Sequence, residues 1–172
     1  MNLLELVKNR KSIRNYKETD ISDEMLNLIF QVVRMAPSSS NLQPWKFIAV
    51  RDIERKKKIA NACQNQKFLI QAPVIVVACG VVDDARDLVG GYMVSYPVDV
   101  AIAMTYLILA AEEKGLGTCW IGDFNEEKLS NILQIPSSIK VVAVASLGYP
   151  NENPSQEYRK NVNEILSFET LQ

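Results

Sequence analysis

The chain has 172 residues, of which 48% are hydrophobic and 23% charged, and its 19 basic residues nearly balance 20 acidic ones. A chain of this size buries a core without disulfide or metal support, and the balanced charge argues against a protein devoted to nucleic acid. No histidine occurs, which excludes Ser-His-Asp and Cys-His nucleophile systems and histidine metal sites. We expect one domain spanning residues 1–172.

Hydrophobic periodicity predicts the elements of the first half of the chain. Ser22 is the expected N-cap of an amphipathic helix that Pro37 terminates. The run 74–82 is continuously apolar, as in a strand covered on both faces. The mixed charges of residues 51–58 indicate a solvated helix face. The predicted elements are helices at 3–9, 22–35 and 52–62 and strands at 45–50 and 74–82.

A long apolar helix is predicted at 98–114, with Asp99 near its start and Gly115 and Gly117 closing it. Its apolar stretch is shorter than the ~18 residues that a membrane span needs, so we expect no membrane association. The stretch is too apolar all round for a helix with a solvated face. A homodimer that covers this helix on every side is therefore expected.

The rest of the second half alternates helix and strand. The predicted elements are a short apolar segment at 118–121, a helix from 125 to 133, a strand at 141–147 and a short terminal element at 163–168. Buried strands separated by helices indicate a three-layer α/β or α+β sheet protein.

The three cysteines, Cys63, Cys79 and Cys119, form neither a CxxC pair nor a zinc spacing. An odd count with no recognisable signal sequence fits a reducing compartment. We therefore expect a cytoplasmic protein with free thiols and no bound metal.

The first candidate site is the basic segment 8–17, which holds five positive charges in ten residues. The guanidinium groups of Arg10 and Arg14 and the hydroxyl of Ser12 could converge on one phosphate group. A solvated basic turn is the alternative, and most charge runs are of that kind. Late in the chain, a pair of basic residues after Tyr158 would either return positive charge to this segment or belong to a plain tail.

A polar loop and a glycine-rich segment are the other candidates. Residues 36–45 place three hydroxyls and two amides between a helix and a strand, which suits a polar ligand or a loop that satisfies its own backbone. Residues 115–124 carry two glycines at P-loop spacing, but Asp123 stands where the lysine belongs and disfavours ATP chemistry. This segment predicts either a backbone that approaches a flat ligand closely or a helix C-cap followed by an edge strand.

Together these segments resemble the nitroreductase family of flavin enzymes. The matching blocks occur in the family's order and span nearly the whole chain, so the ordered set is specific although no single block is. The blocks are Arg10-Lys11-Ser12-Ile13-Arg14, Ala36-Pro37-Ser38-Ser39-Ser40-Asn41-Leu42-Gln43-Pro44-Trp45, Ala72-Pro73-Val74, Gly115-Leu116-Gly117-Thr118 with Ile121-Gly122, and Gly148-Tyr149-Pro150 before Arg159-Lys160.

The resemblance implies an α+β fold of three layers, with a central, mainly antiparallel sheet flanked by helices. It also implies an obligate homodimer with two FMN molecules at the interface. By position, the FMN phosphate and ribityl chain would be held by Arg10, Lys11, Ser12 and Arg14, completed from the tail by Arg159 or Lys160. The flavin ring or its tail would be lined by Ser38, Ser39, Ser40, Asn41 and Asn65, and flavin N5 would face the Gly122 N–H with Asp123 beside it.

One position departs from the family pattern. Phe68 stands where the family carries a lysine, and Lys67 lies one residue early. A cation beside the flavin pyrimidine ring is therefore not assigned.

The implied chemistry is hydride transfer from NADH or NADPH to flavin N5, followed by reduction of a nitroaromatic, quinone or similar small-molecule acceptor on the same face in a ping-pong mechanism. The lack of histidine fits, because the flavin performs the redox step. No side-chain acid or base is required, since water can supply protons, and no catalytic residue is assigned. Three alternatives stay open: a related reductive activity on the same fold (dehalogenation or enone reduction), a non-catalytic flavin-binding or regulatory protein, and a cytosolic structural domain whose basic N-terminus is only surface.

Overall fold

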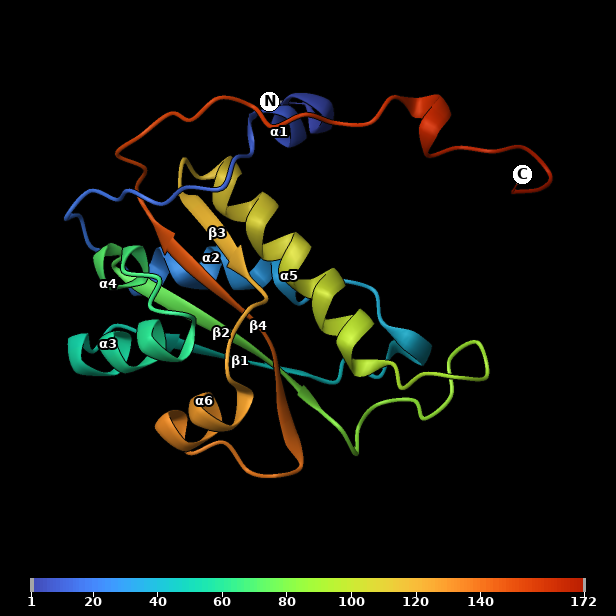
Figure 1. The fold of residues 1–172 in the computed structure, drawn as a ribbon, viewed down its shortest axis with the longest axis horizontal. Coiled ribbons are helices and arrows are strands. Elements are labelled where there is room, and N and C mark those ends of the chain that lie inside the picture. Colours follow the sequence, from blue (N-terminus) through green and yellow to red (C-terminus); the bar gives the residue numbers. More distant parts are fainter. Residues whose placement is uncertain (1, 172) are drawn as a thin grey trace.

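A four-stranded antiparallel sheet lies at the centre of the computed structural model, which describes residues 2–171 (Figure 1). Its order is β1-β2-β4-β3, so β3 and β1 form the two edges. The strands are β1 (Trp45–Val50), β2 (Val74–Val81), β3 (Gly117–Ile121) and β4 (Ile139–Gly148). The antiparallel ladders with helices on both faces confirm the predicted α+β class.

Helices cover both faces of the sheet and make three layers (Figure 1). One face carries α5 (Tyr96–Glu113) and α2 (Asp23–Val33). The other face carries α3 (Ile53–Ala62), α4 (Phe68–Gln71) and α6 (Glu126–Leu133). A short first helix, α1 (Leu3–Asn9), packs on α5 and buries none of its own residues.

Strand side chains alternate between the two helical layers, which explains why β2 reads as a continuous apolar run. Val74 and Val76 pack toward α2 and α5, whereas Ile75 and Val77 pack toward α3 and α6. All four side chains are fully buried. The predicted strand with two covered faces is thus confirmed.

The predicted elements are confirmed, with small shifts at their ends. The long helix begins at Tyr96 because Pro97 is favourable in a first helical turn, where no backbone N–H donor is needed. Its C-terminus is followed by Gly115, whose φ of 73° is left-handed as at a helix C-cap. The four-residue α4 went unpredicted because so short an element has no readable period, and the terminal element is a single 3-10 turn, η2 (Val162–Glu164).

The predicted solvated face of residues 51–58 is wrong at Lys56. Its side chain is buried, and Nζ donates to the backbone carbonyl of Ala72 at 2.7 Å. Burial lowers the pKa of Lys56. The lysine therefore tethers α3 to the end of α4, a role that a charge pattern along the chain cannot reveal.

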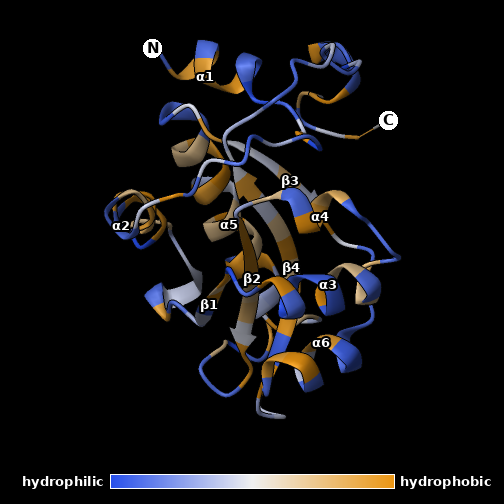
Figure 2. Ribbon diagram, turned by 90° about the vertical axis from the view of Figure 1, so that its left-hand side faces the viewer, coloured by the Kyte–Doolittle hydropathy of each residue, from blue (hydrophilic) through white to orange (hydrophobic). Residues whose placement is uncertain are grey.

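Several apolar side chains are exposed in the single chain, and hydrophobic residues on α1, at the edge of the fold, are among those coloured orange in Figure 2. They lie on α1, on the outer faces of α2 and α5, and in the tail after residue 157. Val98 on α5 is 41% exposed, so the all-round cover expected for this helix is incomplete in one chain. The uncovered set includes Leu3, Leu4, Val7, Leu28, Met35, Val98, Tyr158, Val162, Ile165, Leu166, Phe168 and Leu171. None of the helices formed by residues 2–171 has the length and apolarity required to cross a membrane.

Candidate functional site

The basic segment crosses the end of the sheet as an extended chain and is fixed there. The N–H of Ile13 donates to the carbonyl of Thr118 on β3 at 2.9 Å. The buried hydroxyl of Tyr16 donates to the carbonyl of Ile13. Gly117 permits this close approach, because a Cβ there would lie 2.6 Å from the Ile13 side chain. A freely solvated turn would have none of these contacts.

The C-terminal tail returns to the same segment. One carboxylate oxygen of Glu152 accepts from the backbone N–H groups of Arg14 and Asn15, the latter at 3.0 Å. Lys11 Nζ donates to Oδ1 of Asn153 at 2.6 Å. These contacts hold the residues that follow Asn153 beside the basic segment.

Segment and tail together enclose a cavity of about 280 Å³. The guanidinium groups of Arg10 and Arg14 form no hydrogen bond or ion pair with any residue in the range 2–171, so both can receive a ligand. Arg159 lines the cavity and Lys160 does not. The lining residues are Arg10, Lys11, Ser12, Arg14, Pro154, Ser155, Gln156, Glu157 and Arg159.

The donors of this cavity suit a phosphate dianion. Guanidinium forks and a hydroxyl match phosphate oxygens in geometry and charge, and Glu157 is the one acidic residue in the lining. Glu112 lies nearby with Lys11, where burial raises its pKa and the charges of Arg10 and Lys11 lower it.

A second set of predicted residues gathers at the far end of β3. Gln64 Nε2 donates to Oδ1 of Asp123 at 3.2 Å, and Oδ1 of Asn65 accepts from Asn61 at 2.9 Å. The turn that carries Asn65 therefore lies beside Asp123 and the exposed Gly122. Thr118 and Gly122 are four residues apart, which is about 13 Å along a strand. The cavity and this turn thus occupy the two ends of one short edge strand.

The polar loop, residues 38–41, lies against the first turn of α5 (Figure 1). The N–H and hydroxyl of Ser39 donate to Oδ1 of Asp99 at 2.8 and 3.1 Å. Arg86 Nη1 donates to the Ser40 hydroxyl at 3.2 Å. Two residues of its 3-10 turn η1 (Ser39–Asn41) have positive φ, at 52° and 57°.

The predicted site residues therefore fall into two groups within one chain. Asp99, which holds the loop, and Glu112, which lies beside Lys11, are 13 residues apart on α5, about 20 Å along a helix. The cavity group comprises the cavity-lining residues Arg10, Lys11, Ser12, Arg14 and Arg159, together with Asn65, Gly122 and Asp123 at the far end of β3. The loop group comprises Ser38, Ser39, Ser40 and Asn41. The 38–41 loop and the basic segment therefore lie toward opposite ends of α5.

Three residues that organise these groups were not predicted from the sequence. Asp99 was noted only as a helix-start residue, and Arg86 and Glu152 carried no local signal. A carboxylate in an otherwise apolar helix was the one available hint for Asp99.

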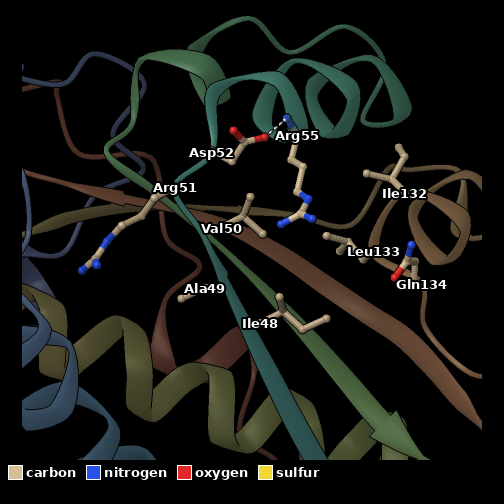
Figure 3. Close-up of a pocket in the computed structure, with 9 residues that line it drawn as sticks. All are labelled: Ile48, Ala49, Val50, Arg51, Asp52, Arg55, Ile132, Leu133 and Gln134. Atoms are coloured by element: carbon tan, nitrogen blue, oxygen red, sulfur yellow. Dashed lines mark hydrogen bonds between the residues drawn. The ribbon is translucent and has the colours of Figure 1, made fainter.

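A separate cavity of about 170 Å³ lies where the end of β1 meets α3 and α6 (Figure 3). Arg55 points into it toward Leu133 and Gln134 (Figure 3). The hydrogen bond drawn there is the N-cap of α3, in which Asp52 accepts from the Arg55 N–H at 2.9 Å. None of the predicted site residues lines this cavity.

All three thiols are buried, and burial disfavours the thiolate. It raises the pKa of Cys63 to about 12 and that of Cys79 to about 11. The pKa of Cys119, next to the cavity group, is also raised by burial, although Arg14 and a hydrogen bond with Ser12 oppose the rise. Cys119 is therefore a thiol at neutral pH and not an activated nucleophile.

Comparison with known proteins adds an independent observation. The model of the Nitroreductase family matches residues 7–73 and 63–149. A protein of Methanothermobacter thermautotrophicus, described as a candidate NADH dehydrogenase/NAD(P)H nitroreductase, is 32% identical over 158 residues, which cover 90% of this chain and 80% of the relative. The FMN reductase [NAD(P)H] of Bacillus subtilis strain 168 is 32% identical over 87% of this chain and 66% of its own length.

A solved structure has the same fold. The crystal structure of a nitroreductase family protein from Clostridium novyi NT superposes with a TM-score of 0.83 at 36% identity, covering 91% of this chain and 89% of that one.

The raised thiol pKa values predict slow alkylation. At pH 7.5 the thiolate fraction of Cys79 is ~100-fold below that of an ordinary thiol, because its pKa is about 11 instead of 9.0. We expect iodoacetamide to leave all three cysteines of the native protein largely unmodified and to modify all three in guanidinium chloride. Peptide mass spectrometry gives the rate at each cysteine, and a Cys119 rate equal to that of the unfolded chain would contradict the thiol assignment.

Proposed function

Because the chain belongs to the nitroreductase family, an oxidoreductase family, we propose that residues 1–172 form a single FMN-binding domain that oxidises NADH or NADPH and reduces a nitroaromatic, quinone or similar small molecule by a ping-pong mechanism. The observation that carries the proposal is the convergence of Arg10, Arg14 and Arg159 on one cavity from opposite ends of the chain. We further propose a cytoplasmic location, in keeping with the three free cysteines.

The residues present fit FMN at both ends of β3. The cavity supplies cations and a hydroxyl for a phosphate, which is the charged end of the cofactor. At the other end of the strand, Gly122 presents backbone without a side chain, and a built Cβ there would meet no atom nearer than 3.9 Å. A flat ring can therefore approach the backbone closely at this point.

When bound, the flavin supplies the two-electron redox chemistry, and the chain supplies binding and orientation. Arg10, Arg14 and Arg159 would neutralise the phosphate and so orient the cofactor. Ser12 adds a hydroxyl, and Lys11 is oriented by its bond to Asn153. The Gly122 N–H would donate a hydrogen bond to the ring. No general acid or base is assigned, because the proton can come from water.

The separation of the two groups supports a homodimer whose sites are shared. The loop group lies at the first turn of α5, about 20 Å along the helix from Glu112, which neighbours Lys11, and we take the loop of one copy to serve the cavity of the other. The uncovered apolar side chains on α1, α2, α5 and the tail favour the same conclusion, because their burial against a second copy is favourable by about 25 cal/mol per Å².

The decisive test of the function is the visible spectrum of the purified protein. We expect flavin bands that anaerobic NADH or NADPH bleaches and that a quinone or nitroaromatic restores. A colourless protein that takes up no FMN would overturn the proposal, and bound flavin that neither nucleotide bleaches would indicate a non-catalytic flavin-binding protein. If only a halogenated aromatic or an enone restores the bleached flavin bands, the protein has a related reductive activity instead.

Steady-state kinetics tests the ping-pong part separately. Donor and acceptor would compete for one stacking face, so each must leave before the other binds. Initial rates at several fixed donor concentrations should give parallel double-reciprocal lines. Intersecting lines would show a ternary complex and reject a single shared face.

The phosphate assignment predicts a contrast between FMN and riboflavin. Charge-assisted hydrogen bonds contribute about 1.5–3 kcal/mol each, so Arg10→Ala or Arg14→Ala should weaken FMN by roughly 10- to 150-fold. Riboflavin lacks the phosphate and should keep its wild-type affinity in both variants. Arg55→Ala is the matched control, because Arg55 lines the separate cavity of Figure 3 and not this one. Fluorescence titration measures the affinities, and unchanged FMN binding in both variants would reject the assignment.

The shared-site proposal predicts a dimer at working concentrations. Light scattering at micromolar protein should give twice the 19.3 kDa chain mass. Placing charge in the uncovered surface with Val98→Glu should shift the mass toward the monomer and lower FMN affinity together, since each site would then lose its second half. A monomeric protein that binds FMN with full affinity would contradict the shared site.

A further inference from the structure

Asp99 is a buried carboxylate among the apolar residues of α5. It is 1% exposed in the first turn of α5. Its Oδ2 is the only buried side-chain oxygen or nitrogen among residues 2–171 with no hydrogen-bond partner. A buried carboxylate with an unpartnered oxygen is costly. Retention of such a group calls for a role other than packing.

The hydrogen bonds of the other carboxylate oxygen of Asp99 indicate what this role is. Oδ1 accepts two hydrogen bonds, from the N–H and the hydroxyl of Ser39, at 2.8 and 3.1 Å. Ser39 opens the turn in which Ser40 and Asn41 both adopt left-handed backbone, at φ 52° and 57°. Such conformations are disfavoured for residues with side chains and persist only when their surroundings hold them.

The 38–41 loop is held mainly by α5. The N-terminal turn of this 18-residue helix stabilises a negative charge, so the carboxylate needs no cation partner. Arg86 holds the loop from the other side through the Ser40 hydroxyl at 3.2 Å. The neighbours of Asp99 along the helix, Val100 and Ala103, belong to the apolar core. An apolar side chain would therefore pack equally well at this position, but it would not accept the two hydrogen bonds from Ser39.

We infer that Asp99 is a positioning residue: its carboxylate fixes the 38–41 loop in the shape in which the loop lines the flavin bound to the second copy. This inference rests on the proposed function. It assigns to the first turn of α5 the task of presenting half of a site whose other half, the cavity group, lies near the far end of the same helix in the partner.

Two substitutions separate positioning from packing. Asp99→Leu removes both hydrogen bonds and the buried carboxylate while keeping a side chain of the same branched shape, so the thermal midpoint of the cofactor-free protein should stay level or rise. FMN and riboflavin should both weaken about 10- to 100-fold, because the loop faces the ring and not the phosphate. Asp99→Asn keeps an oxygen for Ser39 and should retain wild-type affinity for both flavins. A purely structural role predicts that affinity and thermal midpoint fall together.

Subunit mixing provides the sharper test. Co-expression of Asp99→Leu and Arg14→Ala chains with different tags allows the heterodimer to be isolated. If Asp99 serves the partner's site, one site carries both defects and the other carries none, so the heterodimer should bind FMN at half the wild-type stoichiometry at a concentration where both variant homodimers stay empty. If Asp99 acted on its own chain's cavity, each site would carry one defect and the heterodimer would stay empty, which would overturn the inference.

The outcomes distinguish this inference from the function on which it rests. A wild-type protein that takes up no FMN rejects the proposed function and the inference together. Wild-type FMN binding that Arg14→Ala weakens and Asp99→Leu leaves unchanged rejects the inference alone. Should Asp99→Leu fail to fold, Ser39→Ala removes one of the two hydrogen bonds with no change in the core, and an unchanged affinity for both flavins in that variant rejects the inference.

Discussion

The structure depends on the burial of α5. Its 18 residues are apolar around nearly the whole circumference, so the helix must pack against the sheet on one side and be covered on the others. The same helix is about 27 Å long, and it holds the 38–41 loop at its first turn and approaches the basic segment near its last. One chain leaves Val98 partly exposed, and under the proposed homodimer a second copy would cover this helix and complete the site together.

Because the middles of the helices and strands are buried, the polar groups that can reach a ligand lie at the ends of these elements. The central strands β2 and β4 lie between two helical layers and contribute no accessible polar group at their midpoints. The edge strand β3 is different, since the basic segment docks at its start and the exposed Gly122 follows its end. A ligand that is anionic at one end and flat at the other matches this strand. The chain offers positively charged binding groups and no histidine, which suits a cofactor that performs the redox chemistry itself.

Two carboxylates illustrate how the fold fixes loop and extended segments through main-chain hydrogen bonds. Glu152 accepts from the Arg14 and Asn15 N–H groups, and Asp99 accepts from Ser39. Each carboxylate holds a segment of backbone, and the side chains of that segment make the proposed contacts with the ligand. Both act on main-chain groups, so they fix the conformation of the segment rather than the rotamer of one side chain.

The sequence by itself determined the elements and the family. Alternation, N-caps and continuous apolar runs gave helices and strands within a few residues, because these signals are local. The ordered blocks from Arg10 to Gly148 gave the three-layer α+β class. Only the tertiary structure decided that Arg159 and not Lys160 lines the cavity, that Lys56 is buried, and that the 38–41 loop and the basic segment lie toward opposite ends of α5. Those facts depend on contacts between residues up to 142 positions apart, and the packing of distant segments, which makes such contacts, leaves no periodic trace in a single sequence.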